Sequence, residues 1–164
     1  MARVSTRIRR RLTHLQRRRQ RQKNVRTYAQ MSSRYRFDAS LRIAGVGVHH
    51  DEIFSRTGIA STRSHRKGEP RGRNAALGCW TEDLWCLESP LGEQATIDQH
   101  LEWLQSRVAP HKAYFIELRA RAEWADLCLG CLSESPYPFL SASPGALALM
   151  KDLDLGLSFN FTCV

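Results

Sequence analysis

The residues with the clearest capacity for chemistry are basic and lie in one short stretch. Six basic or potentially basic side chains fall within eleven positions, with only Glu69 as an acidic neighbour: Arg63, His65, Arg66, Lys67, Arg71 and Arg73. Such a cluster is suited to bind phosphate, nucleic acid or an acidic partner surface. It can equally be a solvent-exposed loop in which the aliphatic parts of the Arg and Lys side chains cover Trp80 or Trp85, because these side chains stack on aromatic rings. The residue types leave both interpretations open.

A second pattern involves the cysteines. Cys128 and Cys131 have the spacing of zinc and redox motifs. They lie in an apolar run that predicts a strand, where an offset of three places two side chains on opposite faces. The separation of Cys79 and Cys86 is not that of a zinc finger or ribbon. We therefore predict buried packing of the thiols, with neither a metal ion nor a disulfide.

No other constellation in the sequence predicts a reaction. The run from His49 to Glu52 contains four metal-ligating residue types, but adjacent residues rarely converge on one ion, and the i, i+4 spacing of helical metal sites is missing. There is no nucleophile elbow, no cysteine-protease signature and no glycine-rich phosphate loop. The sequence therefore predicts no catalytic residue, no metal and no cofactor.

The strands that must position these residues are predicted from apolar and polar residues that alternate with a period of two, or from continuous apolar runs. They are predicted in four regions: 37–45, 74–89, 124–132 and 155–163. Trp80 and Trp85 fall in the second region, where we expect hairpin strands that cover the core. The stretch 63–73 is polar and turn-rich.

Helices follow from apolar residues at helical spacing and from end signals. They are predicted in four regions: 51–57, 97–108, 115–122 and 144–152. In the first, Ile53, Phe54 and Thr57 are expected to face inward, and Gly58 to end the helix. Thr96 begins a capping box, and Ser143-Pro144 resembles an N-cap followed by the first helical residue. Because strands and helices interleave, we predict an α+β fold, a two-layer sandwich of a mainly antiparallel sheet with helices packed on one face.

The charge is unevenly distributed along the 164 residues. Of the 25 Lys and Arg residues, 13 lie in residues 1–36, which contain no Asp or Glu. Residues 37–164 therefore hold 12 basic against 16 acidic residues, a net charge of −4. We divide the chain into a basic, disordered arm at 1–34 and a single domain at 35–164. Three interpretations of residues 1–30 stay open: a transit peptide, a nucleic-acid-binding arm, or read-through upstream of a true start at Met31.

The sequence predicts no contact with a membrane. The longest uncharged run, 135–150, contains three prolines and is too short to span a bilayer as a helix. An apolar signal-peptide core is missing near the N-terminus. Five cysteines in apolar surroundings agree with a reducing compartment, so a cytoplasmic location is expected.

Several short motifs occur in an order that resembles a known family. They read DEIFSRTGI, TRSHRKGE with Gly68 after the basic pair, LWCLES, IDQHLEWL and a closing LGLSFNF. In this order they resemble the bacterial family called domain of unknown function 4279, over roughly Tyr35 to Val164. The resemblance implies an intracellular α+β domain and supplies no catalytic residue. Some relatives in that family look like immunity proteins, which neutralise toxins.

Two functions follow as hypotheses. The first is a non-catalytic intracellular binding domain, in the form of an immunity-type protein, that recognises a protein partner. The alternative is a nucleic-acid-associated protein that uses the Arg-rich arm together with the Arg63–Arg73 loop.

The arm is predicted to add nothing to folding stability. Its apolar residues at helical spacing, Val4, Ile8, Leu12 and Leu15, form a stripe too thin to bury much surface. A chain beginning at Met31 should therefore melt at the same temperature as the full chain. Thermal melts of both chains test this, and a clearly lower midpoint for the shorter chain would contradict it.

Overall fold

The computed structural model describes residues 35–92, 94–134 and 139–163, and it contains one sheet of five strands. The strands are β1 (Tyr35–Ala44), β2 (Arg63–His65), β3 (Leu84–Glu88), β4 (Trp124–Ser133) and β5 (Gly156–Cys163). Their order across the sheet is β2-β3-β1-β4-β5, and every neighbouring pair is antiparallel except β4 and β5. The predicted α+β class with a mainly antiparallel sheet is confirmed. The predicted arm at 1–34 and the start at Met31 lie outside the described residues.

The longest pairing in the sheet joins β1 to β4. It runs over ten residues of each strand, from Tyr35 opposite Ser133 to Ala44 opposite Trp124. Successive side chains of a strand point to opposite faces, so this register places Leu41 beside Leu127 on one face and Arg42 beside Asp126 on the other. One face of the sheet is apolar as a result, and the other is polar.

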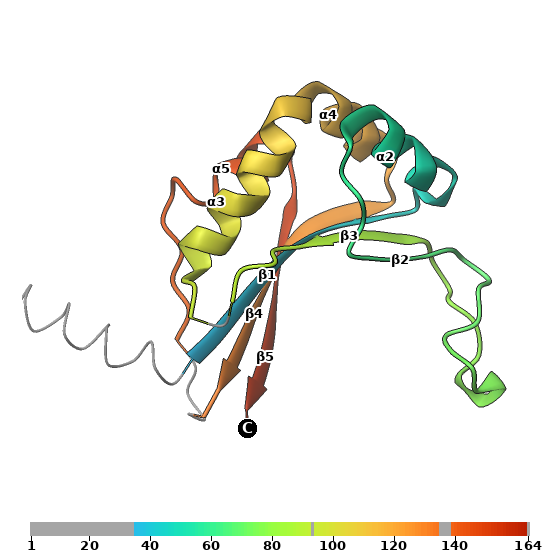
Figure 1. Cartoon of the computed structure of the whole chain (residues 1–164), viewed down its shortest axis with the longest axis horizontal. Helices are drawn as coiled ribbons and strands as arrows, with labels where there is room; N and C mark the ends of the chain where they lie inside the picture. The colour runs from blue at the N-terminus through green and yellow to red at the C-terminus, as the bar shows by residue number, and fades with distance from the viewer. Residues whose placement is uncertain (1–34, 93, 135–138, 164) are drawn as a thin grey trace, which may run out of the picture.

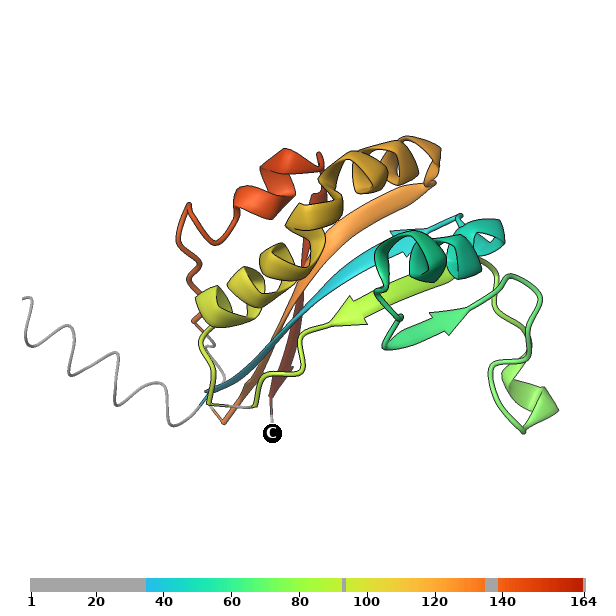
Figure 2. The same ribbon diagram turned by 45° about the horizontal axis from the view of Figure 1, so that its top comes forward.

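The helices lie on the apolar side of the sheet, as Figures 1 and 2 show. They are α2 (His50–Thr57), α3 (Ile97–Val108), α4 (Lys112–Arg121) and α5 (Ala148–Asp152), with short 3-10 turns η2 (Gly47–His49), η3 (Ala75–Leu77) and η4 (Ala109–His111). Leu101 of α3 and Phe115 of α4 pack with the strands and are 0% and 1% exposed. In this ribbon view no described α-helix lies on the opposite side of the sheet (Figure 1).

The start of α3 follows the predicted capping box. The Thr96 hydroxyl accepts a hydrogen bond from the Gln99 backbone N–H at 3.3 Å, and the Gln99 side-chain oxygen accepts one from the Thr96 N–H at 2.8 Å. Both bonds satisfy donors that a helix N-terminus leaves without an intrahelical partner.

Three predictions about local structure were wrong in part. In the predicted strand region 74–89, the strand itself begins only at Leu84. At the start of that region the Asn74 side chain accepts the Ala76 N–H at 3.0 Å, which favours a turn. The stretch 63–73 contains β2, a strand that exists because β3 offers it a partner edge. After Ser143, the backbone forms turns, and the regular helix α5 begins only at Ala148.

The inward face of α2 is narrower than predicted. Ile53 is completely buried, whereas Phe54 is 58% exposed. One residue advances the helix by about 100°, so a short helix that directs Ile53 at the sheet directs its neighbour Phe54 towards water. The predicted stop is confirmed, since Gly58 has a φ of +68° and its N–H bonds to the Phe54 carbonyl at 2.7 Å.

The left-handed conformation of Gly58 at the end of α2 predicts how substitution there changes the free energy of unfolding. A Cβ added at Gly58 or at Gly145 meets no atom within 4 Å, but only Gly58 has a positive φ. Gly58→Ala should therefore lower the free energy of unfolding by about 1 kcal/mol, because L-residues avoid the left-handed conformation. Gly145→Ala should be neutral or slightly stabilising. Chemical denaturation of both variants tests this, and equal effects would contradict it.

Candidate functional site

The six predicted basic residues belong to a hairpin that extends beyond the sheet (Figure 1). We call residues 63–83, which comprise β2 and its connection to β3, the basic hairpin. Its two branches are joined by backbone bonds: the Gly68 N–H donates to the Trp80 carbonyl and the Trp80 N–H donates to the Glu69 carbonyl, both at 2.9 Å. The hairpin therefore has a defined backbone conformation beyond the edge of the sheet.

Trp80 is the centre of side-chain packing within the hairpin. The His65 ring is stacked on it, with centroids 3.7 Å apart and planes inclined by 13°. The guanidinium of Arg71 lies 5.0 Å from the Trp80 ring centroid. Trp85 has a different place: it is 1% exposed in β3 and packs near Phe115 in the core. Of the two tryptophans, only Trp80 belongs to the basic hairpin.

His65 does not act as a cation at neutral pH. It is buried with 9% of its surface exposed, and this burial lowers its pKa below the ordinary value of 6.5, despite the opposing effects of Glu82 and Glu69. A neutral imidazole stacked on an indole supports the hairpin through ring contact. The basic cluster thus loses one of its six predicted members.

Carboxylates from several elements oppose the remaining charges. Glu69 accepts the backbone N–H of Arg66 at 2.8 Å, and Asp83 accepts that of Lys67 at 2.7 Å. The side chain of Arg66 reaches Asp51 of α2 at 3.3 Å. Glu69 is the only acidic residue among positions 63–73, but folding brings in Asp51 and Asp83 from outside the stretch.

The predicted residues therefore divide into three groups. Arg63 forms an ion pair with Glu88 at 3.2 Å on the sheet itself, away from the hairpin tip. His65 and Arg71 pack on Trp80, and Arg66 pairs with Asp51. Within the described part of the chain, the side chains of Lys67 and Arg73 make no ion pair, and both are exposed.

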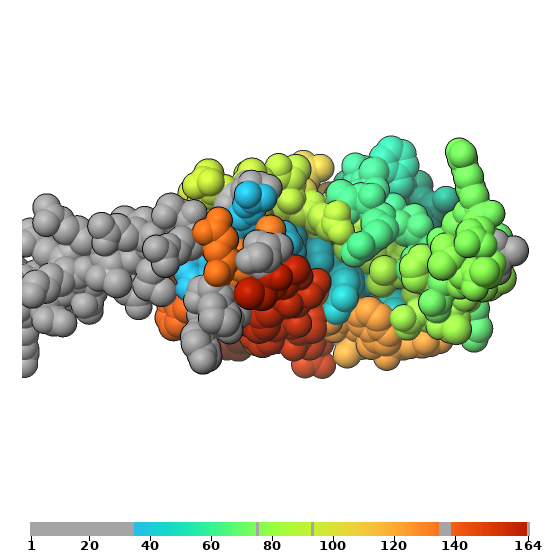
Figure 3. All heavy atoms as spheres, turned by 90° about the horizontal axis from the view of Figure 1, so that it is seen from below, coloured from blue at the N-terminus to red at the C-terminus, as the bar shows by residue number. Residues whose placement is uncertain are grey.

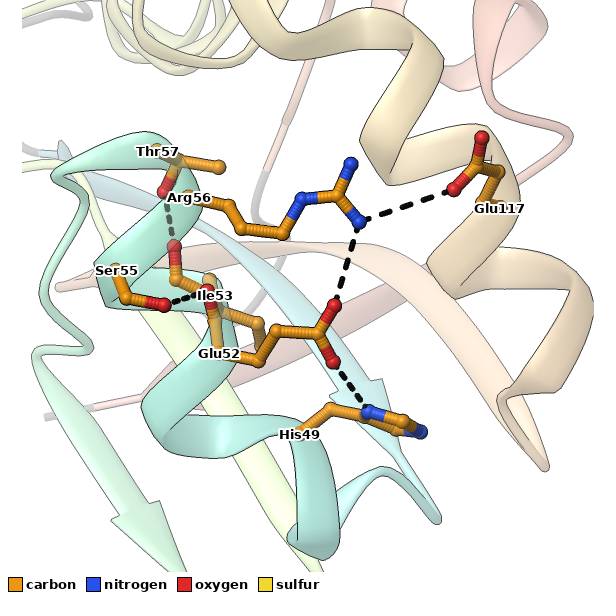
Figure 4. A network of polar contacts seen from close by, with 7 residues as sticks. All are labelled: His49, Glu52, Ile53, Ser55, Arg56, Thr57 and Glu117. Atoms are coloured by element: carbon orange, nitrogen blue, oxygen red, sulfur yellow. Dashed lines mark hydrogen bonds and ion pairs between the residues drawn. The ribbon is translucent and has the colours of Figure 1, made fainter.

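Of the four potential metal ligands from His49 to Glu52, His49 and Glu52 belong to a polar network at the start of α2, which Figure 4 shows. Glu52 lies 2.7 Å from His49 Nδ1 and 3.3 Å from Arg56. Arg56 extends to Glu117 of α4 at 4.0 Å and lies 4.4 Å from the Tyr114 ring centroid, so the network joins α2 to α4. The described residues contain no group of three side chains placed to hold a metal ion.

The polar face of the sheet carries an ion pair that the sequence analysis missed. Arg42 of β1 donates to both carboxylate oxygens of Asp126 of β4, at 2.8 and 2.6 Å, and to the Ser158 hydroxyl of β5 at 2.9 Å. Its guanidinium also lies 5.4 Å from the Trp124 ring centroid. The hydrogen bond to Asp126 raises the pKa of Arg42 above its ordinary value. This bidentate ion pair connects β1 to β4, and the bond to Ser158 extends the connection to β5.

Beside this pair lies a polar hollow of about 380 Å³. Its lining comes from all five strands and a flanking loop: Asp38, Ala39, Ser40, Arg42, Arg63, Glu88, Ser89, Cys128 and Asn160. Alternation in β1 already places Asp38, Ser40 and Arg42 on one face in the sequence. Their neighbours from β2, β3, β4 and β5 become visible only once the strand order is known. The two arginines of the hollow are each paired with a carboxylate, so its charges are largely balanced.

The cysteines lie as the strand pattern predicts. Cys131 is buried on the helix-covered face of β4, whereas Cys128 lines the hollow on the opposite face. Burial raises the pKa of the Cys86 and Cys131 thiols, which keeps both protonated and weakly nucleophilic at neutral pH. All five cysteines are described, and the structure contains each of them as a free thiol.

Comparison with models of protein families identifies the family to which this sequence belongs. The model for the domain of unknown function DUF4279 matches residues 33–163. The chain belongs to the DUF4279 family. Searches of curated proteins and of solved structures find no match. The family match spans the sheet, the four helices of the described residues and the basic hairpin, and it leaves out most of the Arg-rich arm.

The helices of this DUF4279 domain are short. The longest, α3, has 12 residues. Among the residues that the structure describes, no helix is both long and apolar enough to cross a membrane.

Three buried or half-buried histidines predict how stability depends on pH. Burial lowers the pKa of His50, His65 and His100 below 6.5 in the folded domain. The unfolded chain then binds more protons than the folded one as the pH falls through 6.5, so stability present above that pH is lost below it. The melting temperature should therefore fall between roughly pH 7.5 and 5.5.

His65→Phe separates the contribution of the hairpin from that of the other two histidines. Phenylalanine retains an aromatic ring against Trp80 and cannot titrate. The variant should keep the melting temperature of the parent at the upper pH and lose less of it at the lower pH. An unchanged pH dependence in the variant would show that His65 does not contribute.

Proposed function

We propose that this DUF4279 protein is a non-catalytic recognition domain whose basic hairpin binds an acidic surface of a protein partner. The observation that carries the proposal is the hairpin itself, which projects beyond the sheet and leaves Lys67 and Arg73 exposed and without an ion pair among the described residues. Backbone bonds and the Trp80 stack hold its conformation before any partner arrives. Such pre-organisation lowers the entropy cost of binding.

The immunity-type role is one form of this function. In that case the partner is a toxin, and the hairpin covers an acidic surface that the toxin needs for its activity. A cytoplasmic location belongs to the same proposal, and the five free thiols support it because reducing compartments keep thiols unpaired.

Nucleic-acid binding is the second candidate, favoured by the 13 basic residues of positions 1–36. The hairpin supports it weakly. Affinity for a nucleic acid grows with the number of phosphates that Lys and Arg side chains neutralise. Arg63, Arg66 and Arg71 already have contacts within the domain. We therefore place protein recognition first and assign any nucleic-acid affinity to the arm.

A charge reversal in the hairpin tests the proposal. The chain beginning at Met31 is immobilised, and proteins retained from a lysate of the native cells are identified and then purified for titration. The double variant Lys67→Glu/Arg73→Glu should lose the partner, because both changes set a carboxylate against an acidic surface. Arg107→Glu/Arg121→Glu, which makes the same charge change on α3 and α4, should retain it. Equal binding by both double variants would contradict the role of the hairpin.

Titration of a labelled duplex and a labelled single strand into residues 31–164 separates the two candidates. We expect negligible affinity at physiological salt, because residues 31–164 hold 14 basic against 16 acidic residues, a net charge of −2, and offer few free cations. Tight binding that weakens steeply with salt would instead favour the nucleic-acid function.

A further inference from the structure

The strand β5 has an outer edge that no described strand covers. It is the last strand in the sheet order, and it pairs only with β4. Its sequence GLSFNFTC contains no proline and no charged residue. Natural edge strands usually avoid pairing with other chains by being short or by carrying Lys, Pro or a bulge. The eight residues of β5 have none of the residue types that block such pairing.

One face of β5 is apolar and exposed. The register with β4 places Leu157, Phe159 and Phe161 on the helix-covered face, beside Leu127, Leu129 and Cys131. The three β4 residues are buried, yet Leu157, Phe159 and Phe161 are 38%, 51% and 49% exposed. The two phenyl rings are stacked, with centroids 6.0 Å apart and planes inclined by 6°. Figure 3 shows β5, in red, at the surface of the molecule.

We propose that β5 pairs antiparallel with β5 of a second copy, about a two-fold axis at Asn160, and so joins two sheets into one. A second copy fits this edge because the strand is self-complementary. The axis sets Asn160 opposite its own copy, Phe159 opposite Phe161, and Ser158 opposite Thr162. Every apolar side chain then stays on the helix-covered face, and four phenyl rings meet across the axis.

Charge and surface area also agree with a second copy. A two-fold axis brings charges of the same sign from the two copies near each other, which costs energy, and β5 has no charged side chain. One strand pair buries less than the roughly 1,600 Å² of a standard stable interface. The dimer is therefore a reversible one whose population rises with protein concentration.

Sedimentation of the full chain over a wide range of concentration tests the dimer. The parent should shift from monomer to dimer as concentration rises. Phe159→Asp should remain a monomer with an unchanged melting temperature, because this side chain is half exposed and supports little of the core. Ile116→Asp, which places a carboxylate at a 47% exposed apolar residue of α4, should still dimerise. A parent chain that stays monomeric, or a Phe159→Asp variant that dimerises, would overturn the proposal.

Cysteine cross-linking tests the register in a background with Cys79→Ser and Cys163→Ser, which removes the two exposed thiols. Asn160→Cys should form an intermolecular disulfide on mild oxidation, since directly opposed residues lie about 4.5–5.5 Å apart between Cα atoms. Thr162→Cys on the same face should not, because its copy lies four residues away, about 13 Å along the strands. Efficient cross-linking of Thr162→Cys but not of Asn160→Cys would overturn the assigned register.

Discussion

The structure depends above all on the pairing of β1 with β4. These two strands share ten residues of register at the centre of the sheet, where β3 pairs with β1, β5 pairs with β4, and β2 is added at the far edge of β3. A slip of one residue would turn every side chain to the other face, exposing Leu41 and driving Arg42 into the core. Both faces resist such a slip: Leu41 and Leu127 are completely buried on one, and the Arg42–Asp126 pair holds the other. The apolar and polar faces therefore enforce the same register.

The two ends of the sheet differ because the central pairing leaves two edges with different sequences. At one end, β2 has three residues and continues into the charged basic hairpin, which discourages strand addition. At the other end, β5 is long, uncharged and apolar on one face. The two proposed surfaces therefore lie at opposite edges of the sheet. A dimer formed through β5 would leave both basic hairpins at its outer ends, free to bind a partner with two sites.

The basic hairpin shows why a count of charges in sequence overstates a binding site. Six potentially cationic side chains reduce to two that are exposed and make neither an ion pair nor a ring contact among the described residues, Lys67 and Arg73. Burial makes His65 neutral, and Asp51 and Glu88, each distant in sequence, pair with Arg66 and Arg63. Asp83 contributes by accepting the Lys67 backbone N–H. A cluster of cations in a folded domain attracts carboxylates wherever the chain brings them within reach, and the sequence does not show which ones.

Local signals in the sequence determined much of the fold. The alternation in β1 and β5, the apolar run of β4, the capping box at Thr96 and the stop at Gly58 depend on neighbours within a few residues, so they were readable directly. The opposite-face placement of Cys128 and Cys131 follows from the same period of two. Only the tertiary structure decided the rest: that residues 63–65 form a strand, that Trp80 and Trp85 separate, that Phe54 faces water, and that Arg42 meets Asp126. Each of these depends on a partner supplied by strand order, helix orientation or a distant loop, and 84 residues separate Arg42 from the carboxylate that holds it.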